Sequence, residues 1–155
     1  MACYLSPSYF HSFYISRTGK KIVSACADNT FIIWDPRSPS PATKLTAADT
    51  RFNLDGITSL AINPSSTLAV IGGAAGDTRV ISLTKGEVVA ALGGHKEGES
   101  VEAVVFSDLL AVGSGPGFAI TGGTDGKICI WDLSTFKLRT TLQHEVKMNF
   151  IPDCQ

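Results

Sequence analysis

The segment TGGTDGKICIWDL, residues 121–133, combines a glycine pair, an Asp-Gly dipeptide, alternating apolar residues and a Trp-Asp pair. An earlier segment, SACADNTFIIWD at residues 24–35, aligns with it at the polar and aromatic positions, pairing Ser24 with Thr121, Asp28 with Asp125 and Trp34 with Trp131. IGGAAGDTRVIS at residues 71–82 fits the same frame, with Ile81-Ser82 in place of Trp-Asp. The segment is therefore one copy of an internal repeat.

Each copy of the repeat contains four short apolar stretches separated by turn residues. Alternation of this kind is typical of half-buried strands, and the Asp-Asn, Ala-Gly and Asp-Gly corners suit tight hairpins. The sequence therefore predicts an all-β protein of three four-stranded antiparallel units without a helix, at residues 10–45, 57–92 and 101–142. The Pro- and Ser-rich stretch 36–43 is predicted to be a loop inside the first unit and not a linker between domains.

The composition favours a folded protein and excludes several functional classes. Of the 155 residues 44% are apolar and 17% charged, and the net charge is −1. This balance predicts no direct contact with nucleic acid or membrane. Four isolated cysteines without zinc spacing predict no metal site and a reducing compartment, the cytoplasm with the nucleus as a second location; they are Cys3, Cys26, Cys129 and Cys154.

Two glycine-rich stretches superficially resemble ligand loops. GTDGKI at 123–128 has the wrong glycine spacing for a P-loop, and GSGPG at 113–117 lacks the third glycine of a dinucleotide fingerprint. The repeat explains the first as a hairpin corner, and a Pro-Gly turn explains the second. With no paired carboxylates or nucleophile–base pattern, we expect no cofactor and no enzymatic activity.

The repeat resembles the blades of WD40 β-propellers, which have four strands and a period of about 40–50 residues. Gly94-His95 before the third unit and Trp131-Asp132 at its end carry this likeness. It implies a buried structural hydrogen-bond chain of His95, Thr121, Asp125 and Trp131. The first unit keeps Ser24, Asp28 and Trp34 but has no matching His. The second unit lacks the Asp and the Trp, so we expect apolar packing to stabilise it instead.

A narrower likeness lies in the order of GITSLAINPSSTLAVIGG, SVEAVVFS and IWDLSTFKLRTTLQH. This series resembles the WD40 family of angio-associated migratory cell protein and its fungal counterparts. The resemblance implies a non-catalytic scaffold of cytoplasm and nucleus. It further implies a chaperone that captures a newly made large-subunit ribosomal protein in ribosome assembly. An adaptor in a ubiquitin-ligase, signalling or chromatin complex is the alternative.

The likeness also sets expectations about completeness. The family closes a ring of about seven blades, whereas three units give a single partial domain over residues 1–155. Residues 143–155 are expected to be either the start of a truncated next blade or a non-native tail. Open ends favour self-association through blade edges, and a truncated product without independent function is a further alternative.

Candidate partner-binding residues follow from the same resemblance. His11, Thr58 and Glu102 share one position of the first strand, which the family presents near the central channel. Glu97 and Glu99 lie in the preceding loop, and Asp55 precedes the second unit. These acidic residues would suit a basic ribosomal protein; an ordinary solvated loop is the alternative.

Overall fold

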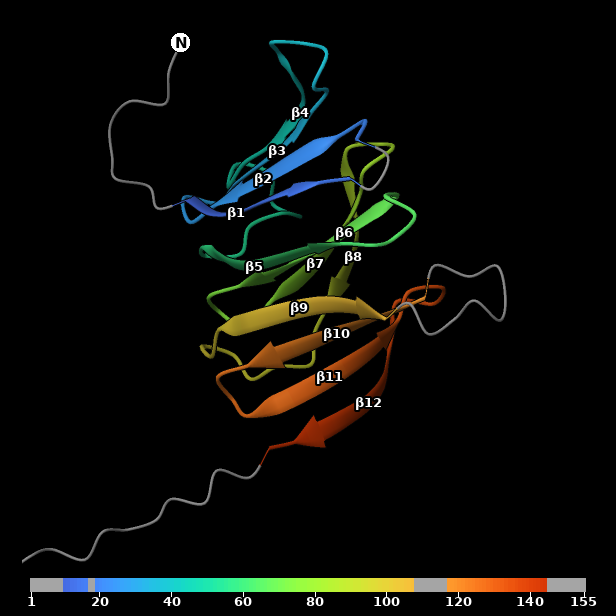
Figure 1. Ribbon diagram of the computed structural model, residues 1–155. Helices are drawn as coiled ribbons and strands as arrows, with labels where there is room; N and C mark the ends of the chain where they lie inside the picture. Colours follow the sequence, from blue (N-terminus) through green and yellow to red (C-terminus); the bar gives the residue numbers. More distant parts are fainter. Residues whose placement is uncertain (1–9, 17–18, 108–116, 145–155) are drawn as a thin grey trace, which may run out of the picture.

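The computed structural model describes residues 10–16, 19–107 and 117–144, and the side chains of the first strand from Phe13 onward. All regular structure in these residues is β-strand, in three antiparallel four-stranded sheets that we call blades 1, 2 and 3 (Figure 1). The predicted all-β architecture is confirmed. Blade 1 contains β1 (Phe10–Ile15), β2 (Ile22–Cys26), β3 (Thr30–Trp34) and β4 (Pro41–Leu45). Blade 2 contains β5 (Ile57–Ile62), β6 (Leu68–Gly73), β7 (Thr78–Ser82) and β8 (Glu87–Leu92). Blade 3 contains β9 (Val101–Ser107), β10 (Phe118–Gly123), β11 (Lys127–Asp132) and β12 (Lys137–Gln143).

The corner between the second and third strands has the same conformation in every blade. Asn29, Gly76 and Gly126 adopt positive φ angles of 61°, 92° and 73°. Each donates its backbone N–H to the carbonyl three residues earlier, at 3.2, 3.4 and 3.1 Å respectively. Glycine and asparagine tolerate this left-handed conformation best, so the predicted corner residues set the hairpin geometry.

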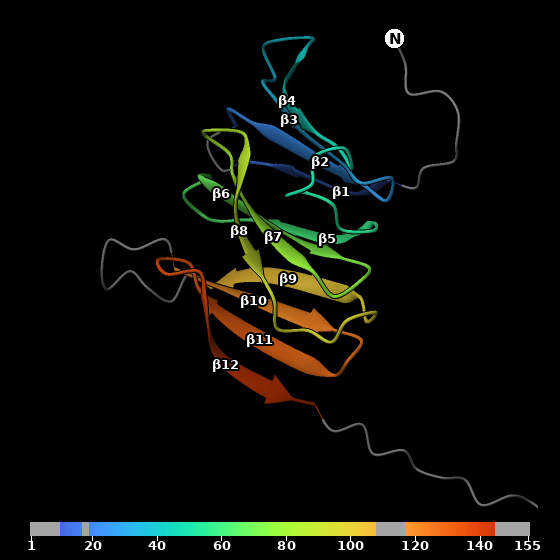
Figure 2. The ribbon, with the colours of Figure 1, turned by 180° about the vertical axis from the view of Figure 1, so that it is seen from behind.

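The blades stack in series, with blade 2 between the other two (Figures 1 and 2). One apolar core fills the space between blades 1 and 2, and a second fills the space between blades 2 and 3. The connection from β4 to β5 adds Phe52 and Leu54, 0% and 1% exposed, to the first core. Burial of these apolar faces is the main force that holds the sheets together.

The observed strands show where each of the three predicted units begins and ends. The sheets run from residues 10 to 45, 57 to 92 and 101 to 143. Gln143, which the sequence places at the start of a further unit, is instead the last residue of β12. Residues 145–155, and most of the longer loop between β9 and β10, lie outside the described part of the chain.

Candidate protein-interaction surface

Four side chains of blade 3 form a continuous hydrogen-bonded chain. Trp131 Nε1 donates to Thr121 Oγ1 at 2.9 Å, and Thr121 Oγ1 lies 2.8 Å from His95 Nε2. His95 Nδ1 lies 3.1 Å from Asp125 Oδ1. Because indole only donates and carboxylate only accepts, the chain assigns Thr121 as donor to His95 and His95 as donor to Asp125. Every polar group in this buried chain has a partner.

Asp125 also joins the chain to two loops. Its carboxylate accepts the backbone N–H of Lys96 at 2.9 Å and that of Lys127 at 3.0 Å. Burial acts to raise the pKa of Asp125, but the hydrogen bonds from Lys96, His95 and Lys127 outweigh it and leave this pKa below its usual value. The side chain is 2% exposed, so its role is structural.

Blade 1 has a shorter version of this arrangement. Trp34 Nε1 donates to Ser24 Oγ at 2.9 Å. Asp28 instead accepts the backbone N–H of Thr30 at 3.0 Å, within its own turn. Asn29 makes the longer contacts, because its side chain bonds Asn53 and the Gly56 N–H, both at 3.0 Å. The sequence resemblance therefore did not identify Asn29 as the residue whose side chain links blade 1 to the connection before β5.

A hollow of about 320 Å³ lies where the loops of blades 2 and 3 meet, and carboxylates from three separate segments line it. Asp55 and Glu97 belong to the connections before β5 and β9, and Asp77 follows the corner of blade 2. All three residues are exposed. Asp77 Oδ1 lies 3.4 Å from Arg79 Nη1 and its side chain is 51% exposed. The hollow can accept a cationic side chain at its rim.

The other predicted partner-binding residues do not enter this hollow. Glu99 accepts a hydrogen bond from Thr124 Oγ1 at 2.8 Å and lies 3.8 Å from Lys96 Nζ, so it joins loops of blade 3. Glu102 accepts from the neighbouring Ser100 hydroxyl. Thr58 Oγ1 bonds the Val101 carbonyl at 2.6 Å, which links blade 2 to blade 3. The backbone of His11 is in β1, but its side chain lies outside the described part.

Asp77 is the residue that sequence reasoning missed. The alignment places Ala75 at the position of Asp125 and leaves Asp77 two residues further along. Its position directly after the predicted Ala75-Gly76 corner is the signal that could have identified it, since binding residues are frequent on loops and turns.

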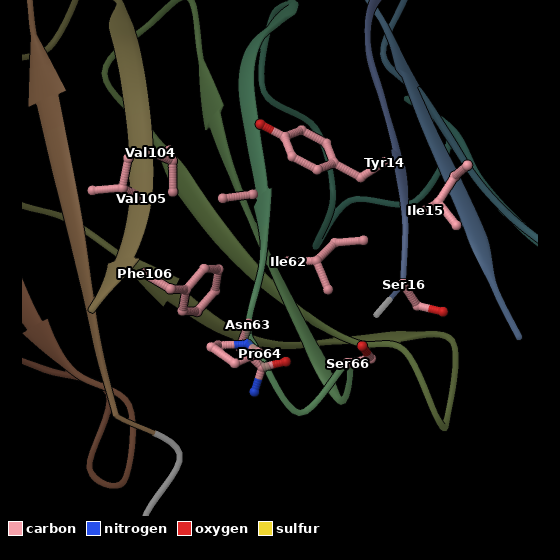
Figure 3. A pocket seen from close by; sticks show the side chains of 11 residues that line it. Tyr14, Ile15, Ser16, Ile62, Asn63, Pro64, Ser66, Val104, Val105 and Phe106 are labelled. Atoms are coloured by element: carbon pink, nitrogen blue, oxygen red, sulfur yellow. The ribbon is translucent and has the colours of Figure 1, made fainter. Parts of the chain in front are cut away.

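A second hollow of about 310 Å³ lies along the neighbouring strands β1, β5 and β9 and is mostly apolar. Figure 3 shows the Tyr14 and Phe106 side chains on either side of β5, with Ile62 between the blades. The Ser66 hydroxyl at its border is buried without a hydrogen-bond partner. Such a surface accommodates an apolar side chain and contains no charged residue among its lining residues.

The described residues offer few groups for chemistry. No set of three or more His, Cys, Asp or Glu side chains in that part of the chain is placed to hold a metal ion. Nor does it include a helix of the length and apolar character needed to cross a membrane. The thiol groups of Cys26 and Cys129 are buried, and desolvation raises the pKa of both. A protonated buried thiol is a poor nucleophile.

Comparison with known proteins decides the family. The sequence model of the WD domain, G-beta repeat matches residues 7–35 and 86–132, the segments that contain both Trp-Asp pairs. The chain belongs to the WD40-repeat family. WD40 domains act as protein-interaction scaffolds, so the loops and exposed faces of the blades are the surfaces that matter for function.

Two curated WD40 relatives align with most of the chain. An uncharacterized WD repeat-containing protein of Schizosaccharomyces pombe is 25% identical over 144 residues, which cover 87% of this chain and 34% of the relative. Human angio-associated migratory cell protein is 29% identical over 140 residues, covering 82% and 30%. The chain thus spans about a third of the length of these relatives.

Solved WD40 structures share the fold. Chaetomium thermophilum Sqt1, bound to the N-terminus of the ribosomal protein L10, has a TM-score of 0.75 at 25% identity, over 90% of this chain and 37% of that one. The RRP9 WD40 repeats have a TM-score of 0.77 at 14% identity, covering 90% and 40%. At this lower identity the likeness to RRP9 shows the fold alone.

Proposed function

We propose that this WD40 chain is a non-catalytic binding module that receives a basic protein segment at the hollow of Asp55, Asp77 and Glu97. The observation that carries the proposal is the convergence of three exposed carboxylates from three separate segments on one concave site. A lysine or arginine side chain placed there would enter a hollow lined by all three carboxylates. Complementary charge of this kind favours fast and selective association.

The partner that fits best is a basic large-subunit ribosomal protein, which the module would hold as part of an assembly chaperone. The likeness to Sqt1, solved with the N-terminus of ribosomal protein L10, supports this choice. We propose the cytoplasm, with the nucleus as a second location, as the place of action. The buried thiol of Cys129, which is in no disulfide, suits such reducing compartments.

The test is titration of the chain with a basic peptide from the N-terminus of the host's L10-type ribosomal protein. The triple variant Asp55→Asn, Asp77→Asn, Glu97→Gln should bind about tenfold more weakly, since each exposed ion pair contributes up to about 1 kcal/mol. The salt dependence of binding should fall in parallel. Glu87→Gln is the matched control, because this exposed glutamate lies outside the hollow and pairs with Lys85 at 3.6 Å.

Equal binding by the triple variant and the Glu87→Gln control would refute the assignment of the hollow. Lack of binding by the unaltered chain at low salt would refute the ribosomal-protein partner.

An adaptor for a different protein is the second candidate function. The apolar hollow beside Tyr14 and Phe106 favours it, because an apolar surface suits a hydrophobic partner segment and not a basic one. Affinity capture with the unaltered chain and with Tyr14→Ser separates the two functions. Loss of a captured partner with Tyr14→Ser, but not with the triple acidic variant, would favour the adaptor.

A further inference from the structure

The loop between β3 and β4 contains two consecutive Ser-Pro pairs, Ser38-Pro39 and Ser40-Pro41. The second pair leads directly into β4, which begins at Pro41. Both flanking strands belong to blade 1, so the loop is an internal part of that blade. The acidic hollow and the apolar hollow are lined by other residues, and the two serines have no part in either.

Three prolines keep this loop out of regular structure. Pro36, Pro39 and Pro41 have no backbone N–H to donate, so the segment cannot form a complete ladder of hydrogen bonds. A proline also favours extended backbone in the residue before it, which applies to both Ser38 and Ser40. Neither serine lies in a helix or a strand. Their hydroxyl groups are therefore carried by a segment that an enzyme can bind in extended form.

The loop is open to solvent over its whole length. All of residues 36–42 are exposed. The loop extends beyond the strands of blade 1 at the top of Figures 1 and 2. The Ser40 backbone N–H donates to Ser38 Oγ at 3.3 Å, so this contact does not use the hydroxyl proton of Ser38. An enzyme can approach both serines without opening a core.

A phosphate group on Ser38 would have a basic neighbour. Arg37 Nη2 lies 2.8 Å from Asp35 Oδ2, and the Arg37 side chain is 80% exposed. Water screens such an exposed ion pair, so it is easily exchanged. A phosphate carries more negative charge than a carboxylate and has three acceptor oxygens, so it competes with Asp35 for the guanidinium. The N–H of Ser40 is a second donor directed at the same place.

We propose that Ser38 and Ser40 are phosphorylation sites for a proline-directed protein kinase. In each transfer the serine Oγ attacks the γ-phosphorus of ATP and forms the new P–O bond, while the bond from that phosphorus to the β–γ bridging oxygen breaks. The hydroxyl proton passes to the catalytic base of the kinase, and ADP leaves. Each phosphate adds about −1.5 to −2 charges, so the loop changes from a balanced Asp35–Arg37 pair to a strongly anionic surface.

The loop and the acidic hollow lie at opposite ends of the strands. β3 begins beside the corner at Asn29 and ends at the Ser-Pro loop. The Asn29 side chain bonds the Gly56 N–H at 3.0 Å, next to Asp55 of the hollow. Phosphorylation should therefore leave the binding of a basic peptide unchanged, and each of the two proposals can fail without the other.

Mass spectrometry of the chain, purified from its source cells with phosphatases inhibited, tests the proposal. A proteolytic fragment that spans residues 36–43 should gain about 80 Da for each phosphate, and fragment ions should place the added mass on Ser38 and Ser40. Treatment with a protein phosphatase should remove this mass. The fragment excludes the Ser-Pro pair at residues 6–7, which lies outside the described part of the chain.

A proline variant separates a proline-directed kinase from other enzymes. Pro39→Ala combined with Pro41→Ala keeps both hydroxyl groups but removes the proline that follows each of them. Pro36→Ala is the matched control, because this exposed proline of the same loop follows Asp35 and not a serine. After circular dichroism shows that both variants are folded, the double variant should lack the added mass and Pro36→Ala should retain it.

Three results would overturn the proposal. The first is an unaltered chain whose Ser38 and Ser40 carry no phosphate. The second is phosphate that persists on both serines in the double proline variant, or that is lost in Pro36→Ala. The third is an added mass that a phosphatase does not remove, which would indicate a different modification such as a sugar.

Discussion

Replacement of Thr121 by valine tests whether the hydrogen-bonded chain of blade 3 stabilises the fold. Valine keeps the shape and the β-branched strand preference of threonine but removes the hydroxyl group. The change leaves Trp131 Nε1 and His95 Nε2 without their partner at sites that are 2% and 0% exposed. Since each buried unpaired group costs about 1–3 kcal/mol, the loss of a partner by two groups should lower the free energy of unfolding by about 2–6 kcal/mol. That is a large part of the ~5–15 kcal/mol typical of a domain.

Thr78 provides a matched control for this substitution. Thr78 is also 0% exposed in a strand, but its hydroxyl has no hydrogen-bond partner. Thr78→Val should therefore raise the free energy of unfolding by about 1 kcal/mol. Urea unfolding followed by tryptophan fluorescence, at one fixed protein concentration, measures both changes. Equal effects of the two substitutions, or a change below about 0.5 kcal/mol for Thr121→Val, would show that burial and not hydrogen bonding matters at this position.

Three further changes have expected outcomes. Gly94→Ala should cost about 1–3 kcal/mol in urea unfolding, because its Cβ would lie 2.7 Å from Trp131, whereas Gly93→Ala meets nothing within 4 Å and should be neutral. The pKa of Asp125 is lower in the folded protein than in the unfolded chain, where it is near 3.8, so the ionised carboxylate stabilises the fold above that pH. This stabilisation is lost as the pH falls through the folded-state pKa. Asp125→Asn should therefore show a smaller loss of stability in acid, and equal acid sensitivity would contradict the assignment. Arg79 binds the carbonyls of residues 51 and 53 at 2.8 and 3.3 Å, so Arg79→Met should speed amide exchange in the connection from β4 to β5 and leave blade 3 unchanged.

The sequence predicted the strands because the blades are built from local patterns. Alternation between polar and apolar residues defines a strand, and a left-handed Asn29, Gly76 or Gly126 defines the corner that follows. The likeness to WD40 blades also predicted the hydrogen-bonded chain of His95, Thr121, Asp125 and Trp131, which are up to 36 residues apart in the sequence.

The partners of the remaining polar residues were beyond sequence reasoning, because contacts between blades decide them. Thr58, a predicted partner-binding residue, donates a hydrogen bond to the Val101 carbonyl of the neighbouring β9, and the sequence did not predict this contact. Glu99, a predicted partner-binding residue, accepts a hydrogen bond from Thr124 of the next hairpin, and the sequence did not predict this contact. The pattern of a strand determines which face of the sheet a residue occupies, but it does not determine which groups of the next sheet contact that residue.

The position of Asp125 shows how structural and binding roles separate between the blades. In blade 3 this corner carboxylate is bonded by His95 and Lys96 and its side chain is 2% exposed, so a partner cannot reach it. Blade 2 has the small Ala75 there, and Ala75 lines the acidic hollow. Loss of the hydrogen-bond chain in blade 2 therefore leaves room at the corner, and Asp77 supplies a carboxylate that is exposed. Ala75→Met would fill this room without altering charge, so weaker binding of a basic peptide by that variant would show that the shape of the hollow contributes beside its charge.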